Sequence, residues 1–110
     1  MKIRDEKRYD VVICNLEGEV NAINSGQLRK AFDEIIKGNE QKVLVDFSRV
    51  SYIDSSGLAT LIEMFRSLKK IGGRMRFSGM DPKVRNIFEI VKLHRLFEIF
   101  DTQDIALKDF

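Results

Sequence analysis

The stretch "YIDSSGLAT", residues 52–60, places an aspartate, two adjacent serines and a glycine where an apolar run changes to a helical spacing. A serine hydroxyl at the start of a helix can act in three ways. It can cap the helix, accept a phosphate, or attack a substrate as a nucleophile. The rest of the sequence bears on which of these applies.

The first alternative is that Ser55 or Ser56 caps the helix, because a hydroxyl oxygen can accept a hydrogen bond from a free amide of the first turn. Such a cap stabilises a helix by about 1 kcal/mol. It accounts for one serine but not for Gly57, since a glycine inside a helix costs about 1 kcal/mol relative to alanine.

The second alternative is that Ser56 accepts a phosphate. A glycine in the first turn would expose the backbone around Ser56, and the free amides and dipole of a helix amino end tolerate an anion. A phosphoserine would bring about −1.5 to −2 charges beside Asp54, enough to repel an acidic partner surface without unfolding the domain. This alternative predicts a switch.

The third alternative, a nucleophilic serine, fits the sequence poorly. The motif is not G-x-S-x-G, and the only histidine that could serve as a base, His94, lies near the end of another predicted helix. One histidine and one cysteine, Cys14, are also too few for an ordinary zinc site. We therefore predict no catalytic residue, no metal, no cofactor and no enzymatic activity.

The elements that position the motif alternate between strands and helices. Apolar runs predict strands at residues 9–20, 42–54 and 74–79, the first of them covered on both faces, and the charged opening, residues 1–8, is expected to form a short edge strand. Helical spacing predicts helices at 27–41, at 55–73 and from Asp81-Pro82 onward, before "LFEIF" and a final amphipathic stretch. Alternation predicts an α/β domain with a largely parallel sheet, and "IDSSG" then lies at the carboxyl edge of that sheet.

The composition favours one soluble globular domain over residues 1–110. Hydrophobic residues make up 44% and charged residues 33% of the chain, and the net charge is +2. Acids accompany the basic residues along the chain, so we expect no direct contact with nucleic acid. The single cysteine, the charged first ten residues and the absence of a long apolar stretch predict a cytoplasmic protein without membrane insertion.

The chain from "NLEGEVNAINSGQL" to its last helix resembles the STAS domain of bacterial anti-sigma factor antagonists. The likeness rests on D-S-S-G-L, followed by a glycine pair and by a helix with the pattern P-x-V-x-x-[IL]-F. It implies a mixed, mostly parallel sheet of four to five strands with about four helices packed on it.

The resemblance also implies a role in partner switching. In such systems the unmodified antagonist binds an anti-sigma factor that is itself a serine kinase, and so frees the sigma factor. The kinase then phosphorylates the serine before the glycine, which is Ser56 here, and a PP2C-type phosphatase restores it. The residues expected to contact the partner are Glu19, Asn21, Asp54, Ser55, Gly57, Leu58 and Met64.

One residue departs from the pattern of the family. Its members often read G-E-[LIV]-D after the early strand, whereas this chain reads "GEVN" and places Asn21 there. An amide keeps the hydrogen bonding but loses a charge that could pair with a basic group of a kinase. Either the partner differs, or the neighbouring Glu19 compensates.

Other residues leave alternatives open. Met64 lies off the face formed by Leu61, Phe65 and Leu68, so it either extends an exposed contact surface together with Leu58 or is covered by another element. Cys14 is predicted to be a packed core thiol and His94 a surface or capping residue. The five basic residues of "RSLKKIGGRMR" indicate a solvated helix end or, less commonly, a surface for an acidic partner or a membrane.

The function also has an alternative within the family. The chain could be a STAS subunit of another assembly, such as a lipid-transport or stressosome-like complex. Its serines would then form a docking surface that is never phosphorylated. The expected oligomeric state is a monomer or a weak dimer.

Overall fold

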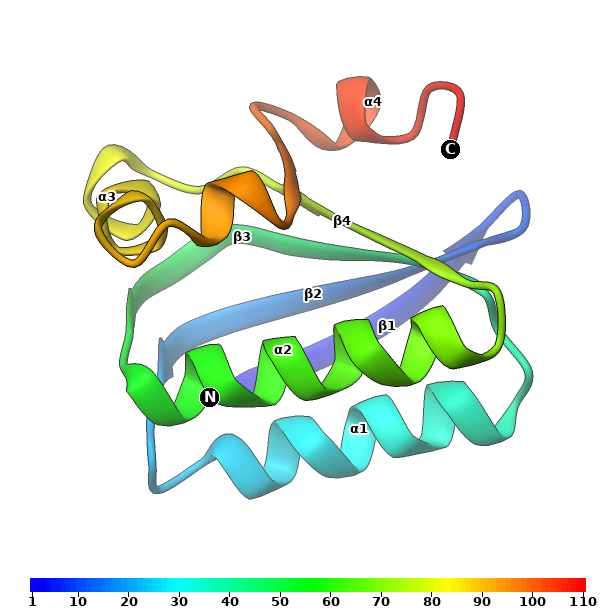
Figure 1. The fold of residues 1–110 in the computed structure, drawn as a ribbon, viewed down its shortest axis with the longest axis horizontal. Coiled ribbons are helices and arrows are strands. Elements are labelled where there is room, and N and C mark those ends of the chain that lie inside the picture. The colour runs from blue at the N-terminus through cyan, green and yellow to red at the C-terminus, as the bar shows by residue number, and fades with distance from the viewer.

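A computed structural model describes all residues from Met1 to Phe110, and the strands and helices alternate in it as predicted (Figure 1). The strands are β1 (Lys2–Arg8), β2 (Val11–Val20), β3 (Lys42–Ile53), β4 (Arg74–Ser78) and β5 (Glu98–Phe100). The helices are α1 (Ser25–Lys37), α2 (Ser55–Lys70), α3 (Pro82–Ile90), the 3-10 turn η1 (Leu93–Arg95) and α4 (Gln103–Ala106).

The five strands form one sheet in the order β1-β2-β3-β4-β5. β1 is antiparallel to β2, and all other neighbours are parallel, which confirms the mixed, mostly parallel sheet. Each parallel connection passes through helical segments, as parallel neighbours require. Because the register pairs Val20 with Ile53, the loops that follow β2 and β3 begin side by side at one edge of the sheet.

The main hydrophobic core lies between the sheet and α1, α2 and α3. It contains 21 buried residues, and a cluster of phenylalanine rings from β3, β4, α3 and the residue just before β5 packs edge to face within it. α1 and α2 run next to each other along this face (Figure 1). Cys14 is fully buried here and burial raises the pKa of its thiol, so the prediction of a packed core thiol is confirmed.

The opposite face of the sheet is covered only in part, so the prediction that residues 9–20 are covered on both faces is confirmed for Val11–Cys14 and wrong for the rest of β2. α4 and the residues after it cover Val11, Ile13 and Leu44, on the other side of the sheet from α2 (Figure 1). The remaining strand positions on this face carry polar side chains, such as Arg4 and Asn15, which water can cover.

A buried arginine holds the C-terminal segment on this face. The guanidinium of Arg76, on β4, donates to the carbonyl oxygens of Ala106 at 3.0 Å, Lys108 at 2.7 Å and Asp109 at 3.0 Å. The rings of Phe100 and Phe110 lie over it, with centroids 5.0 and 4.6 Å away. Arg76 thereby supplies hydrogen bonds to backbone carbonyl oxygens at the end of α4 and just after it, which a helix of four residues cannot pair internally.

The helix ends agree with the predicted stop signals. α1 ends at Lys37, just before Gly38 and Asn39, and α2 ends at Lys70, just before the glycine pair. A Cβ on Gly73 would lie 2.6 Å from the carbonyl oxygen of Gln41, so only glycine lets the chain turn into β4 there. No helix combines the length and the apolar character that crossing a membrane requires.

Candidate functional site

The loop after β2 and the start of α2 meet at the carboxyl edge of the sheet. The amide of Asp54 donates to the carbonyl oxygen of Val20 at 3.0 Å, which continues the pairing of β2 with β3 by one residue. We call residues 54–57 the serine junction. It lies where sequence reasoning placed it, at the point where a buried strand passes into a helix.

Asp54 fastens the serine junction on two sides. Its Oδ1 accepts a hydrogen bond from the amide of Gly57, and its Oδ2 accepts one from the amide of Ala22 in the loop after β2, both at 3.0 Å. The carboxylate therefore caps α2 and also holds the neighbouring loop in place.

The prediction that Ser55 or Ser56 caps α2 is therefore wrong. Asp54 has the extended backbone of an N-cap residue, with φ −100° and ψ −176°, and both serines belong to the first turn of the helix. Aspartate and serine are about equally good caps, so the residue that stands at the strand end takes the position. The serine hydroxyls are left free for another task.

The Ser56 side chain lies half-buried at the surface, and its hydroxyl has no hydrogen-bond partner within the protein. Its carbonyl oxygen accepts a bond from the hydroxyl of the buried Thr60 at 3.0 Å, which fixes the backbone of the first turn. The amides of Ser55 and Ser56 are also unpaired, as expected at the amino end of a helix. The arrangement offers an accessible hydroxyl, two free donors and the positive end of a helix dipole.

Gly57 has a different reason to be a glycine from the one expected. It is buried, and a Cβ on it would lie 2.7 Å from Cγ1 of Ile53 and 2.8 Å from Cγ1 of Val20. Glycine thus permits the close approach of α2 to the ends of β2 and β3. It does not bare the backbone around Ser56 to a partner, so that expectation is wrong.

Leu58 and Met64 do not extend an exposed contact surface. Both are members of the main core, and Met64 is only 3% exposed. Of the two alternatives for Met64, the one in which another element covers it is confirmed. Gly57 is buried as well, so all three residues pack within the protein, and their contact with a partner stays a prediction.

Asn21 forms the turn that leads into α1. Its Oδ1 accepts from the amides of Ile23 at 3.0 Å and Asn24 at 3.2 Å. Asn24 returns the interaction, because its Oδ1 accepts from the amide of Asn21 and its Nδ2 donates to the carbonyl oxygen of Glu19. A carboxylate oxygen could accept the same two bonds, so the change from aspartate to Asn21 preserves the local structure. The side chain of Glu19 is exposed nearby.

Sequence reasoning missed two exposed apolar side chains that flank the serine junction. Ile23 is 95% exposed in the loop that Asp54 holds, and Tyr52 is exposed at the end of β3, two residues before Asp54. The ammonium of Lys83, in the first turn of α3, lies 5.9 Å from the centroid of the Tyr52 ring. An isoleucine in the polar turn "NAINS" was the available signal, since such a turn has no core to bury it.

The chemistry of this edge is that of recognition. The residues with polar groups free for a partner are Glu19, Ser55 and Ser56, and Ile23 and Tyr52 add apolar area. No three histidine, cysteine, aspartate or glutamate side chains gather anywhere in the structure to form a metal-binding group. His94, the only histidine of the chain, is exposed in η1, which follows α3 in the sequence.

Comparison with known proteins gives consistent matches over the whole chain. The family model of the STAS domain matches residues 2–106. The anti-sigma-B factor antagonist of Listeria monocytogenes is 30% identical over 90% of this chain and 84% of its own length. The crystal structure of TM1081 from Thermotoga maritima has a TM-score of 0.92 at 27% identity, covering 97% of this chain and 92% of that one. The Bacillus cell fate determinant SpoIIAA, in its phosphorylated form, has a TM-score of 0.76 at 23% identity over 96% of both chains.

Proposed function

This chain belongs to the STAS domain family, and we propose that it is an anti-sigma factor antagonist that acts by binding and is switched by phosphorylation of Ser56. The proposed partner is an anti-sigma factor with serine kinase activity. A PP2C-type phosphatase is proposed to remove the phosphate and restore the binding form. Relatives bearing the name anti-sigma factor antagonist align with nine-tenths or more of the chain and support this assignment. Its site of action is then the cytoplasm, where sigma factors and RNA polymerase work.

The observation that carries the proposal is the free hydroxyl of Ser56 beside the fixed carboxylate of Asp54. A kinase needs a reachable hydroxyl, and the half-buried Ser56 side chain offers one without any protein bond to break. SpoIIAA, which has the same fold, exists in a phosphorylated and an unphosphorylated form. We take the corresponding modification in this chain to fall on Ser56, the serine directly before Gly57.

The surface that meets the kinase consists of residues from both loops at the sheet edge. Ile23 and Tyr52 provide apolar contact area, and Ser55, Ser56 and Glu19 provide polar groups. Aromatic and large aliphatic side chains of this kind contribute much of the binding free energy at protein interfaces. Burial of Ser56 in this contact makes the interface sensitive to any group added to its hydroxyl.

Phosphorylation weakens the contact through charge and volume. The new dianion lies next to Asp54, whose two oxygens are held by Gly57 and Ala22, so the carboxylate cannot turn away from it. The free amides at the amino end of α2 can accommodate the phosphate, so the modified protein should stay folded. A loss of about 3 to 5 kcal/mol at the interface lowers affinity by roughly two to four powers of ten, which is sufficient for release.

Two variants of Ser56 test this proposal against a candidate anti-sigma factor kinase from the same organism. Ser56→Ala keeps the shape of the surface, so we expect it to bind the kinase about as well as the unmodified protein and to resist release by ATP. Ser56→Asp introduces a negative charge and should bind at least about tenfold more weakly. Calorimetric titration of each variant, with circular dichroism as a fold check, gives both affinities.

Equal affinities of the two variants would remove the switch. If the protein binds its partner but never takes up phosphate, the chain is a docking module of another assembly, and the phosphorylation part of the proposal fails. Ser55→Ala is the matched control, because Ser55 is the adjacent exposed serine and its loss should leave phosphate uptake intact.

A further inference from the structure

A second exposed surface lies in the connection between α3 and β5. Its sequence is "IVKLHRL", residues 90–96. Ile90 is 70% exposed, Val91 51% and Leu96 46%, although this connection packs η1 against α3. Single exposed apolar residues are ordinary on protein surfaces, but three within seven consecutive residues form a patch of the kind found at binding sites.

Basic side chains are interleaved with this apolar patch and have no acidic partner. Lys92, His94 and Arg95 are exposed, and none of them forms an ion pair. The acids nearest in the chain are already engaged. Glu89 pairs with Arg85, and Glu98 pairs with Arg74 and Arg76. The surface therefore presents uncompensated positive charge around exposed apolar groups.

The C-terminal end of α2 extends this positive surface. Lys69 and Lys70 in the last turn of α2, and Arg66 one turn earlier, are exposed and form no ion pair. These residues begin the basic stretch that the sequence singled out and that the serine junction does not use. Of the five basic residues in that stretch, Arg76 is buried and Arg74 pairs with Glu98, so only the three on α2 are open to a partner.

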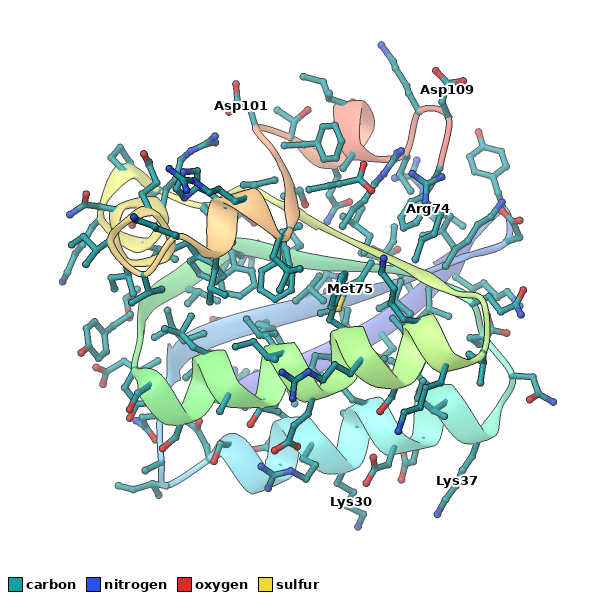
Figure 2. The ribbon with its side chains drawn as sticks, in the orientation of Figure 1. Lys30, Lys37, Arg74, Met75, Asp101 and Asp109 are labelled. Carbon is teal, nitrogen blue, oxygen red and sulfur yellow. The ribbon has the colours of Figure 1, made fainter.

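A hollow of about 300 Å³ joins the two parts of this surface. Its apolar lining includes Leu96, Phe65 of α2 and Met75 of β4. Its charged lining comes from Lys69, which has no acidic partner, and from Arg74 and Glu98, which pair with each other. Figure 2 shows Met75 between β4 and α2. The hollow can take an apolar side chain from outside, while the lysine at its rim can meet a carboxylate.

We propose that residues 90–96 and this hollow, together called the basic surface, bind an acidic segment of a partner protein that inserts an apolar side chain beside Leu96. The unpaired basic side chains select acidic residues, and the hollow selects a partner with a protruding apolar group. A lipid bilayer has no such protruding group, and proteins bind it by inserting their own side chains, so the concave shape favours a protein partner.

The hollow of the basic surface is distant from the serine junction. Lys69, which lines the hollow, lies about 20 Å from Ser56 along α2, because an α-helix rises about 1.5 Å per residue. A phosphate on Ser56 is therefore separated from Lys69 by more than about two Debye lengths at physiological salt, and we expect binding in the hollow to be independent of the state of Ser56.

Selection of peptides from a random dodecapeptide library displayed on phage tests the proposal directly. We expect the peptides that bind the full chain to contain several aspartates or glutamates around a leucine or phenylalanine. Fluorescence anisotropy with a synthetic copy of the most enriched peptide then gives the affinity. The double variant Lys92→Glu/Arg95→Glu and the variant Leu96→Ser should each weaken it about tenfold or more.

A matched control separates this effect from net charge. Lys30 and Lys37 extend from α1 into solvent, away from the basic surface (Figure 2). Lys30→Glu/Lys37→Glu makes the same change in net charge and should alter the affinity less than about twofold, as should Ser56→Asp.

Several outcomes would overturn the proposal. They are the enrichment of no peptide, the enrichment of peptides without acidic residues, and equal weakening by the two double variants. Sedimentation with phosphatidylglycerol vesicles that depends on Lys92 and Arg95 would instead assign the surface to a membrane, which also overturns it. All the substituted side chains except that of the half-buried Ser56 are exposed, and circular dichroism of each variant checks that the fold is retained.

Discussion

At the scale of single residues, Asp54 and Gly57 hold the serine junction in shape, while the hydroxyl of Ser56 makes no hydrogen bond within the protein. The sequence predicted the motif and its place at a strand-to-helix junction, but it assigned the cap to the wrong residue. Serine and aspartate are about equally good caps, and only the position of the strand end decides between them. The inward direction of Gly57 could not be predicted either, because it depends on where Val20 and Ile53 meet α2.

Gly57→Ala should destabilise the protein by about 1 to 3 kcal/mol, because the added methyl group overlaps Ile53 and Val20 in a packed core. Gly26→Ala is the control, since open space surrounds that position in the first turn of α1. It should be neutral or stabilising by up to about 1 kcal/mol. Urea unfolding of the two variants measures both effects, and equal destabilisation would contradict the close approach at Gly57.

Asp54→Ala should lower both stability and partner binding. Loss of the cap costs about 1 to 2 kcal/mol, and loss of the bond to Ala22 frees the loop that carries Ile23. Asp81→Ala removes the equivalent cap of α3, where the carboxylate accepts from the amide of Val84 at 2.8 Å, and should cost a similar amount. Titration of the kinase with both variants should show weaker binding only for Asp54→Ala. Equal affinities would mean that the loop after β2 is not part of the interface.

At the scale of elements, the pairing of β2 with β3 brings the two loops of the serine junction together. The alternation of apolar strands with helical spacings predicted the parallel sheet and the edge strand β1. It did not predict that a short C-terminal segment covers only part of the second face of the sheet. A continuous apolar run such as "VVIC" looks the same whether a long helix or such a segment covers it. The hydrogen bonds from Arg76 to that segment join residues about thirty positions apart, and local sequence patterns do not reveal contacts of this kind.

Arg76→Met should release the C-terminal segment while leaving the main core folded. The methionine fills much of the same space but cannot donate to the carbonyl oxygens of Ala106, Lys108 and Asp109. Hydrogen exchange should therefore become faster in residues 103–110, with amides of β3 and α2 unchanged. Unchanged exchange throughout would show that the apolar contacts hold this segment without the arginine.

An aspartate on the edge strand β1, Asp5, should make the stability of the protein depend on pH. Asp5 lies opposite Cys14, and partial burial raises the pKa of its carboxyl, an effect that outweighs the hydrogen bond with the thiol. The folded state therefore holds the proton more tightly than the unfolded state, so this group lowers stability as the pH rises through its raised pKa.

Asp5→Asn should then be more stable than the original protein at neutral pH, and the difference should vanish at a pH below the ordinary pKa of aspartate. Asp10→Asn should give the opposite trend, because the hydrogen bond from Lys42 lowers the pKa of the Asp10 carboxyl. Thermal unfolding from acid to neutral pH measures the effect. A constant difference at all pH values would show that the charge of Asp5 is not its cause.

At the scale of the whole molecule, the sheet and its helices present two separate surfaces. The serine junction lies at the amino end of α2, and the hollow of the basic surface lies beside the last turns of this helix. The family resemblance in the sequence predicted the fold and the first surface. It gave no indication of the second, since the exposure of Ile90, Val91 and Leu96 follows from how α3 ends and η1 turns toward β5. The two proposals together predict a molecule that is switched at the serine junction while it stays bound at the basic surface.

The most direct test of the proposed switch combines phosphate mapping with affinity. The protein is incubated with the candidate kinase and ATP, the modified residue is identified by mass spectrometry, and the affinity of the purified modified form is measured by calorimetry. We predict phosphate on Ser56 alone and a loss of affinity of roughly a hundredfold or more. Phosphate on another residue, or a modified form that binds as tightly as the unmodified one, would contradict the account.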